Sequence, residues 1–238
     1  MLKYIFFDND NTLTRSRSPI TPEMSGLLKR LAKKYEVIVV SGGSDEKQIR
    51  PQLGEDLRGK YWSMGQNGNV CIDRSGKVIW EHKLNWLQKF EVLTYAYRIY
   101  LQNTFPYKDK FDLVEDRGSQ ISFSFVGHTE KNILKKEKFD PDKTKRATIL
   151  KKFPFKSKTM DVKIAGTTCL DFFAKGSNKG KNIADLCKKM GWKKNECLYV
   201  GDALFKNGND ESVIGVIPLK KVSDPKDTEG VIRKLLSQ

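Results

Sequence analysis

A short apolar run that ends in two closely spaced carboxylates constrains the fold of this chain more than any other feature. The run extends from Tyr4 to Phe7, and Asp8 and Asp10 follow it in an asparagine-rich turn. A strand that ends in this way delivers both carboxylates to the carboxyl edge of a sheet, where open α/β folds bind their ligands. The sequence therefore predicts an active site at this turn.

Two carboxylates this close repel each other unless a cation neutralises them, and Mg²⁺ with its oxygen ligands suits that position. One carboxylate could then attack phosphorus while the other moves a proton. The structural alternative is an Asx-type turn whose side chains only fix a loop, and the turn alone does not decide between the two. A calcium loop fits less well because Pro19 stands where that loop requires a glutamate.

Signals for helices and strands alternate in the first part of the chain. Thr21 followed by Pro22 is typical of a helix start, and apolar residues follow at helical spacing. The run from Val37 to Val40 indicates a buried parallel strand, after which the chain turns. Ser44, with acids directly behind it, is typical of an N-cap. Ser41, at the strand tip, is better placed to hold a phosphate oxygen, although an ordinary turn serine explains it equally well.

The middle of the chain, from 82 to 175, has a different character. A helix is predicted over 84–101, alternating patterns over 121–125 and 161–173 indicate strands, and a lysine-rich stretch at 141–153 is typical of a helix. The outline helix-strand-strand-helix-strand predicts an α+β module inserted into an α/β domain. The first helix carries an aromatic stripe, which we expect to belong to the hydrophobic core rather than to a ligand-binding site. The stripe comprises Trp86, Leu87, Phe90, Leu93, Tyr97 and Tyr100.

Helix and strand signals alternate again in the last part of the chain. A helix begins near Lys179, and the strand from Cys197 to Val200 runs directly into Asp202. Asn209 and Asp210 follow a loop later. Three acidic clusters, each at or near a strand end, are not expected to be three independent turns.

Composition narrows the class of protein. The longest apolar stretches are far shorter than the roughly 20 residues that span a bilayer, and no signal peptide is apparent. The four cysteines form no C-x-x-C pair, which predicts reduced thiols in a cytoplasm. The net charge of +15 would suit a nucleic acid or an anionic small substrate. We do not expect a nucleic-acid partner, because the lysines are scattered in pairs and no nucleic-acid-binding motif is present.

Taken in order, the acidic segments and two further residues resemble the four motifs of the haloacid-dehalogenase-like (HAD) phosphotransferases. They are Asp8 to Thr12, Ser41, Lys179 and the run from Gly201 to Asp210. The insertion that precedes Lys179 resembles the α/β cap of subclass IIB, and the phosphomannomutase-like branch is the most similar. The resemblance spans essentially the whole chain. One departure is Asn11, where glycine is usual, which is tolerable because asparagine adopts left-handed conformations more readily than most residues.

The resemblance implies an α/β fold, with a Rossmann-like parallel-sheet HAD core at residues 1–81 and 176–238. The α+β cap of type IIB would occupy residues 82–175. It also implies Mg²⁺ as cofactor and a small phosphorylated substrate, such as a sugar phosphate, with no membrane partner. Members of the branch often pair through their caps, so the helix at 84–101 is a candidate homodimer surface as well as candidate core.

The same resemblance implies a role for each motif residue. Asp8 would be the nucleophile that forms an aspartyl-phosphate, and Asp10 the general acid and base. Ser41 and Lys179 would hold the transferring phosphoryl group. The structural alternative for Lys179 is a solvated lysine at a helix start, which the helix dipole mildly disfavours. The implied metal ligands are Asp8, the carbonyl of Asp10, Asp202, Asn209 and Asp210.

Cap residues would recognise the rest of the substrate. Arg117, Ser124 and Asp171 correspond to substrate-binding positions, whereas Cys169 replaces a serine. His128 stands where an arginine would clamp a second phosphate, although a surface position at a strand end explains it equally well. A mutase must hold two phosphates at once, so this change favours hydrolysis of a sugar phosphate, with phosphomannomutase activity as the alternative. Nucleic-acid binding by an inactive HAD scaffold is disfavoured, because every catalytic position is filled.

Overall fold

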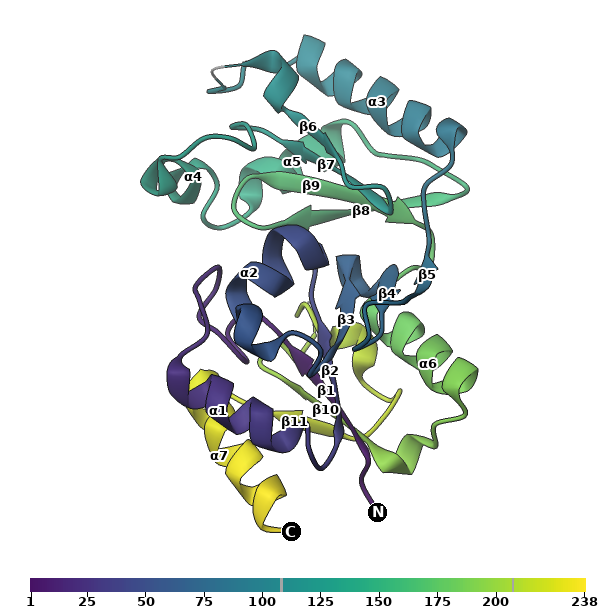
Figure 1. The fold of residues 1–238 in the computed structure, drawn as a ribbon. Helices are drawn as coiled ribbons and strands as arrows, with labels where there is room; N and C mark the ends of the chain where they lie inside the picture. The colour runs from purple at the N-terminus through teal and green to yellow at the C-terminus, as the bar shows by residue number, and fades with distance from the viewer. Residues whose placement is uncertain (108, 207) are drawn as a thin grey trace. The chain divides into compact units, whose positions relative to one another are not determined.

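The strand before the acidic turn lies within a seven-stranded sheet (Figure 1). In this computed structural model, which describes residues 1–107, 109–206 and 208–238, that strand is β1 (Tyr4–Asp8). The order across the sheet is β11-β10-β1-β2-β3-β4-β5, and its pairs are parallel except β3 with β4 and β4 with β5, which are antiparallel. The other strands are β2 (Glu36–Val40), β3 (Trp62–Gly65), β4 (Val70–Ile72), β5 (Val78–Glu81), β10 (Cys197–Gly201) and β11 (Leu219–Lys221).

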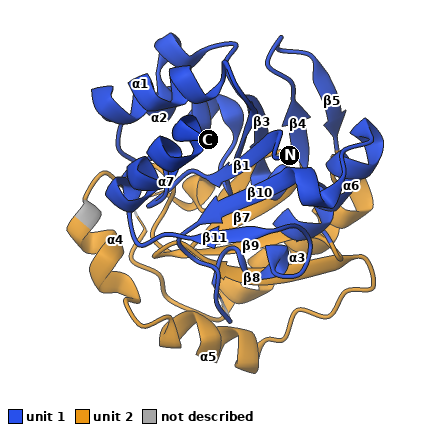
Figure 2. Cartoon of the chain, turned by 90° about the horizontal axis from the view of Figure 1, so that it is seen from below, with its two compact units in different colours: residues 1–81, 177–238 blue, residues 82–176 orange. Residues whose placement is uncertain are grey.

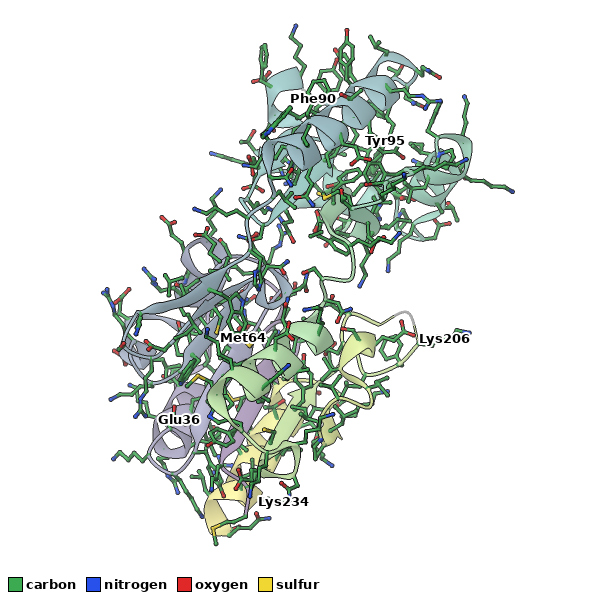
Figure 3. All side chains as sticks on the ribbon, turned by 90° about the vertical axis from the view of Figure 1, so that its right-hand side faces the viewer. Glu36, Met64, Phe90, Tyr95, Lys206 and Lys234 are labelled. Carbon is green, nitrogen blue, oxygen red and sulfur yellow. The ribbon has the colours of Figure 1, made fainter. Side chains whose placement is uncertain are left out.

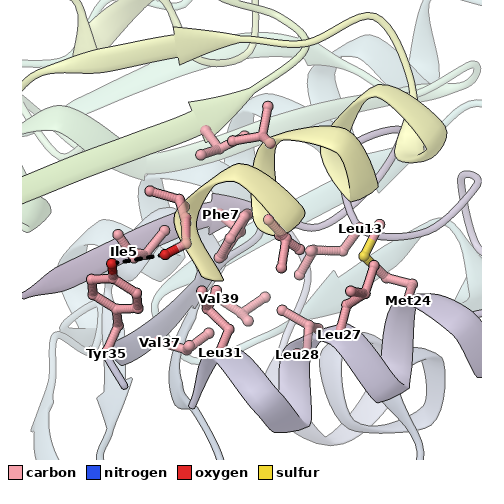
Figure 4. Packing of buried hydrophobic residues seen from close by; sticks show 14 of the residues in the cluster. Ile5, Phe7, Leu13, Met24, Leu27, Leu28, Leu31, Tyr35, Val37 and Val39 are labelled. Atoms are coloured by element: carbon pink, nitrogen blue, oxygen red, sulfur yellow. Dashed lines mark hydrogen bonds between the residues drawn. The ribbon is translucent and has the colours of Figure 1, made fainter. Parts of the chain in front are cut away.

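Helices cover both faces of this sheet. On one face α1 (Pro22–Leu31) and α7 (Pro225–Ser237) pack with Ile5 and Phe7 of β1, as Figure 4 shows in part. On the other face α6 (Lys179–Met190) packs with Phe6. Side chains alternate across a strand, so one apolar run supplies both layers of core. The short helix α2 spans Arg50–Leu53, a single π-helical turn spans Asp45–Ile49, and 3-10 turns lie at Glu55–Leu57, Gln66–Gly68, Lys110–Asp112, Lys194–Glu196 and Glu211–Val213.

Local sequence signals set the ends of these helices. The hydroxyl of Thr21 accepts a hydrogen bond from a backbone N–H of α1. The side-chain Oδ1 of Asn178 accepts one from a backbone N–H at the start of α6. Gly191, with φ of 69°, ends α6 in the left-handed conformation that glycine adopts without strain. Ser44 caps the π-helical turn. The predicted helix starts and the predicted N-cap are therefore confirmed.

The chain divides into two compact units, residues 1–81 with 177–238 and residues 82–176 (Figure 2). The second unit contains a four-stranded antiparallel sheet of order β6-β7-β9-β8. A mostly parallel sheet beside a separate antiparallel one confirms the predicted fold class. None of the described helices is long and apolar enough to span a membrane. The elements of the second unit are α3 (Trp86–Leu101), β6 (Val114–Asp116), β7 (Gln120–Ser124), α4 (Ile133–Phe139), α5 (Thr144–Lys152), β8 (Met160–Ala165) and β9 (Cys169–Ala174).

The predicted outline of this second unit was wrong in two places. The pattern at 161–173 is not one strand but the hairpin of β8 and β9, which turns at Gly166 with φ of 49°. The helix predicted at 141–153 is α5, but the outline lacked α4, which precedes it; Asp140 ends α4, and Lys143 adopts a left-handed conformation before α5. Alternation that continues across a short turn hides the turn, which explains the first error.

The expectation that the aromatic stripe of α3 belongs to the core was also wrong. The buried side of this helix carries Val92, Tyr95, Ala96 and Ile99. Only Tyr100 of the stripe packs against the core. The other members are exposed, Phe90 by 66%; Figure 3 labels Phe90 and Tyr95 on this helix. The helix is apolar on two faces, so the sequence pattern did not reveal which face is buried. The exposed members are Trp86, Leu87, Phe90, Leu93 and Tyr97, to which the structure adds Leu101.

Candidate active site

Two neighbouring strands bring the acidic turns together. Asp8 is the last residue of β1, Asp202 follows β10, and the two strands are parallel and paired in register. Asp210 comes from the loop after β10. One carboxylate oxygen from each of these three residues lies within 4.8 Å of the other two. The Thr12 hydroxyl accepts a hydrogen bond from the backbone N–H of Asp202 at 3.1 Å, which ties the first acidic turn to the second.

Lys179 lies at the centre of these carboxylates. It is the first residue of α6, and its Nζ atom is 2.5 Å from Asp8 Oδ1 and 2.7 Å from Asp210 Oδ1. The side chain is only 1% exposed. The alternative of a solvated helix-start lysine is therefore wrong, because a buried lysine paired with two carboxylates is held in one place.

Burial dominates the electrostatics of this cluster. Burial raises the pKa of Asp8 to about 7, and the charge and hydrogen bond of Lys179 only partly oppose this shift. Burial also raises the pKa of Asp202, and the nearby charge of Asp210 adds to the effect. Burial would lower the pKa of Lys179, but Asp8 and Asp210 outweigh it and raise that pKa. The cluster contains three carboxylates and one ammonium group, so a further positive charge would stabilise it.

The donor set fits a hard divalent cation. Asp210 Oδ2 is buried, and among the described residues it has no hydrogen-bond partner. Asp8, Asp202 and Asp210 each bring one carboxylate oxygen to the cluster, and together they offer the all-oxygen ligation that Mg²⁺ prefers. Asn209, the other predicted ligand of this loop, is exposed. The acidic cluster therefore has both the chemistry and the unsatisfied oxygen that a metal site requires.

Asp10 is held by two glutamines that the sequence analysis did not single out. Its Oδ2 accepts a hydrogen bond from Gln48 Nε2 at 2.6 Å, and its Oδ1 accepts from Gln52 Nε2 at 3.0 Å. The backbone N–H of Arg17 donates to the same Oδ1 at 3.0 Å. Gln48 and Gln52 are four residues apart in the helical segment after β2, a spacing that puts both on one face and could have indicated them. Asn11 adopts the left-handed conformation anticipated for it, with φ of 59°.

Ser41 and Ser44 differ in what they already bind. The Ser44 hydroxyl caps the following helical turn. Ser41 directly follows β2, which pairs in register with β1 up to Asp8 and Val40, so Ser41 lies at the same sheet edge as Asp8. Its buried hydroxyl accepts a 3.2 Å hydrogen bond from the N–H of Gly43. Of the two serines, Ser41 is the one at the acidic edge.

A second polar cluster lies on the antiparallel sheet of the other unit. Arg117 Nε donates to Glu115 Oε2 at 2.6 Å, and its Nη1 atom is 4.0 Å from Asp171 Oδ2. The Ser122 hydroxyl donates to Asp171 Oδ1 at 2.6 Å. The sequence analysis missed Glu115 and Ser122. The spacing of two residues between 115 and 117 and between 122 and 124 was the signal for shared faces.

His128 belongs to the same cluster. Its Nε2 atom lies 3.1 Å from the carbonyl oxygen of Ser122, and its Nδ1 atom lies 3.6 Å from Glu115 Oε2. The side chain is 17% exposed and lies shortly after the end of β7, so it is partly buried, and its contact with a substrate stays a prediction. Burial lowers the pKa of His128, with the hydrogen bond to Ser122 opposing the shift. His128 is therefore mainly neutral near pH 7.

The remaining two predicted positions face each other in the sheet. Ser124 of β7 pairs in register with Cys169 of β9. The Ser124 hydroxyl is fully buried, lies 3.2 Å from Thr168 Oγ1 and accepts a 3.1 Å hydrogen bond from the N–H of Gly127. Ser124 thus bonds both to the turn that follows β7 and to Thr168, the residue before β9.

Comparisons with known proteins agree with this geometry. A family model described as haloacid dehalogenase-like hydrolase matches residues 5–214. Phosphomannomutase 1 of Dictyostelium discoideum is 27% identical over 242 residues, which cover 96% of this chain and 94% of that protein. The phosphomannomutase of Nicotiana benthamiana is 30% identical over 219 residues, which cover 87% and 82%.

Solved structures share the fold at low sequence identity. A protein of Streptococcus mutans UA159 superposes with a TM-score of 0.72 at 16% identity over the whole of both chains. The IMP-nucleotidase of Plasmodium falciparum gives 0.69 at 16% identity, covering 99% of this chain and 62% of that one. At such identity these structures support the fold alone.

Proposed function

The chain belongs to the haloacid dehalogenase-like hydrolases, a family of phosphoryl-transfer enzymes, and on that premise we propose that it hydrolyses a small phosphomonoester through a phosphorylated Asp8. The observation that carries this proposal is the buried contact of Lys179 with Asp8 and Asp210, beside Asp202. A nucleophile fixed by a buried cation at the carboxyl end of a central strand is suited to attack on phosphorus.

In the proposed reaction an Asp8 carboxylate oxygen attacks phosphorus, and the bond from phosphorus to the leaving oxygen breaks. Asp10 gives a proton to that leaving oxygen. A water molecule then attacks this phosphorus while Asp10 accepts its proton; the bond from phosphorus to the Asp8 oxygen breaks, and free phosphate leaves. Lys179 and Ser41 hold the phosphoryl oxygens, where fixed donors are most useful as charge shifts in the transition state.

Family membership implies a divalent metal, and we propose Mg²⁺, held by Asp8, Asp202, Asp210 and the Asp10 carbonyl. Asn209 would complete the set through an outer contact. Bound there, the cation would neutralise the carboxylates and polarise a phosphoryl oxygen. The observation that supports this assignment is the buried Oδ2 of Asp210, which has no hydrogen-bond partner in the part of the chain that the structure describes.

The polar cluster of the second unit favours hydrolysis over a mutase reaction. We propose that Arg117, His128 and Asp171 contact the leaving part of the substrate, with hydroxyl groups as their partners. A second phosphate would need strong cationic donors. Here Arg117 already pairs with Glu115 at 2.6 Å, and burial lowers the pKa of His128 so that it is mainly neutral. A sugar monophosphate fits these residues better than a bisphosphate.

Phosphate release from a panel of phosphomonoesters with Mg²⁺ tests the proposal. It is run beside a coupled assay for conversion of mannose 1-phosphate to mannose 6-phosphate with a bisphosphate activator. We expect free phosphate from one or a few sugar phosphates, and none from the near-isosteric variant Asp8→Asn with an unchanged circular dichroism spectrum. Isomerisation without release would establish the mutase alternative, which the relatives named phosphomannomutase support.

Self-association through α3 is the partner proposal that accompanies this function. Trp86, Phe90, Leu93 and Tyr97 repeat at intervals of four, three and four residues, the spacing of a helix seam, and each is at least 47% exposed. A contiguous exposed apolar stripe of this kind marks an interaction surface. We propose that the same face of a second copy covers it.

A further inference from the structure

Tyr199 is a buried polar side chain beside the acidic cluster to which no role has yet been given. It lies in the middle of β10, opposite Phe6 of β1, and is fully buried. Its hydroxyl donates a 2.8 Å hydrogen bond to Asp210 Oδ1. A phenylalanine would fill the same space without having to satisfy a buried hydroxyl, so the hydroxyl calls for an explanation.

The two oxygens of Asp210 have very different surroundings. Oδ1 accepts hydrogen bonds from both Tyr199 and Lys179, at 2.8 and 2.7 Å. Oδ2 is buried and has no partner among the described residues. A Cβ atom on Gly201 would lie 2.5 Å from Oδ2 and 2.7 Å from Tyr199 Cε1, so glycine keeps the space beside both groups open. Asp210 is thus anchored through one oxygen while the other is left for a ligand.

The two donors to Asp210 differ in how they are shared. Lys179 divides its ammonium group between Asp210 and Asp8. The Tyr199 hydroxyl has a single proton to donate, and it donates that proton to Asp210 Oδ1.

We propose that Tyr199 is a positioning residue for the divalent cation: its hydroxyl fixes Asp210 Oδ1 so that Oδ2 faces the metal. This inference rests on the metal site of the proposed function. Partners of this kind, which orient a ligand without touching the metal, typically contribute 10- to 100-fold in metal affinity or activity.

The variant Tyr199→Phe tests the proposal because it removes a single oxygen atom. Mn²⁺ binding is measured by the electron paramagnetic resonance signal of the free ion at fixed pH and without substrate. We expect the Mn²⁺ dissociation constant to rise about tenfold. The increase in melting temperature that Mg²⁺ produces should shrink in parallel.

Tyr35→Phe is the matched control. Tyr35 is also buried in the first unit, and its hydroxyl donates a 3.0 Å hydrogen bond to the carbonyl oxygen of Leu235, drawn as a dashed line in Figure 4. Loss of this hydroxyl should lower the melting temperature of the metal-free protein about as much as Tyr199→Phe does. It should leave the Mn²⁺ dissociation constant unchanged, because the partner of Tyr35 is the backbone carbonyl of Leu235 and not a proposed metal ligand.

The outcomes separate the inference from its premise. If the wild-type protein binds no Mn²⁺, the proposed metal site is wrong. If it binds Mn²⁺ and Tyr199→Phe binds it equally well or more tightly, the metal site stands and the role of Tyr199 is overturned. Failure of Tyr199→Phe to fold, while Tyr35→Phe folds, would also overturn it, because the hydroxyl would then be needed for the fold.

Discussion

At the scale of single residues, Lys179 shows how this site is held together. One ammonium group pairs with two of three clustered carboxylates, and both of these contacts are buried. A buried ion pair is weak evidence for net stabilisation, but removing one partner is costly because the other charge is left buried and alone. The arrangement is therefore sensitive to loss of the lysine and, if the metal site is right, to the cation as well.

Lys179→Gln should lower the free energy of unfolding of the metal-free protein by about 3–5 kcal/mol, because Asp8 and Asp210 lose their buried partner. Urea unfolding measures the loss, and Mg²⁺ should recover part of it. Lys181→Gln is the control: Lys181 lies on the same helix, but its ion pair with Asp185 is exposed, so its removal should cost less than about 1 kcal/mol. Equal losses in the two variants would contradict the assigned role of Lys179.

The lowered pKa of His128 should make the free energy of unfolding depend on pH. Burial lowers its pKa below 6.5 in the folded protein. As the pH falls below 6.5, the unfolded chain binds a proton at His128 before the folded chain does, so stability decreases until the folded pKa is passed. Above pH 6.5 both states are mainly neutral and the contribution vanishes. The unfolding free energy of His128→Gln, compared with wild type between pH 5 and 7, should therefore fall less steeply with acid; parallel curves would contradict the shift.

At the scale of elements, one turn links two parts of the candidate active site. Gln66, Asn67 and Gly68 all have positive φ angles, of 52°, 59° and 86°. The N–H of Asn67 donates to the carbonyl oxygen of Ser41 at 2.7 Å, and its carbonyl accepts from Asn182 Nδ2 of α6 at 2.8 Å. The turn after β3 thereby fixes the end of β2 to the helix that begins with Lys179. A turn with three left-handed residues persists only because the surrounding contacts hold it.

Gly68→Ala should lower the free energy of unfolding by clearly more than about 1 kcal/mol. The new Cβ atom would meet Asn182 Cβ at 2.7 Å and Met64 Cε at 2.8 Å, in addition to the positive φ. Gly76→Ala separates these effects, since Gly76 has φ of 88° and nothing within 4 Å of the added atom. Urea unfolding of the two variants should show a larger loss at Gly68; equal losses would mean that the collision is relieved without cost.

At the scale of the whole molecule, the exposed stripe of α3 is the feature that a single chain leaves unexplained. The helix buries one apolar face in its own unit and exposes another. Exposed apolar residues are ordinary when scattered, but a stripe along four turns of one helix is not.

Phe90→Lys should therefore shift the protein from dimer towards monomer in sedimentation velocity, because it puts a charge in the middle of the proposed seam. Its thermal stability as a monomer should change little, since Phe90 is 66% exposed. Phe111→Lys is the control, as Phe111 is 82% exposed but lies outside α3. A wild-type protein that is monomeric at all concentrations, or a dimer that Phe90→Lys leaves intact, would contradict the proposal.

The sequence by itself determined the fold class, the main strands and helix caps of the first unit, and the family. Buried strands appear as continuous apolar runs, and helix caps have characteristic residue types, so both can be predicted from the sequence alone. The order of the acidic motifs identified the family because they stand at strand ends that a parallel sheet brings together.

Only the tertiary structure decided what depends on contacts between distant segments. It buried Lys179 against Asp8 and Asp210, placed the hydroxyl of Tyr199 on Asp210, and showed that the aromatic stripe of α3 faces outward. These contacts join residues as many as 171 positions apart. Periodicity shows which residues share one face of a helix but not what covers that face. A lysine at a helix start likewise has the same local sequence pattern whether it is solvated or buried.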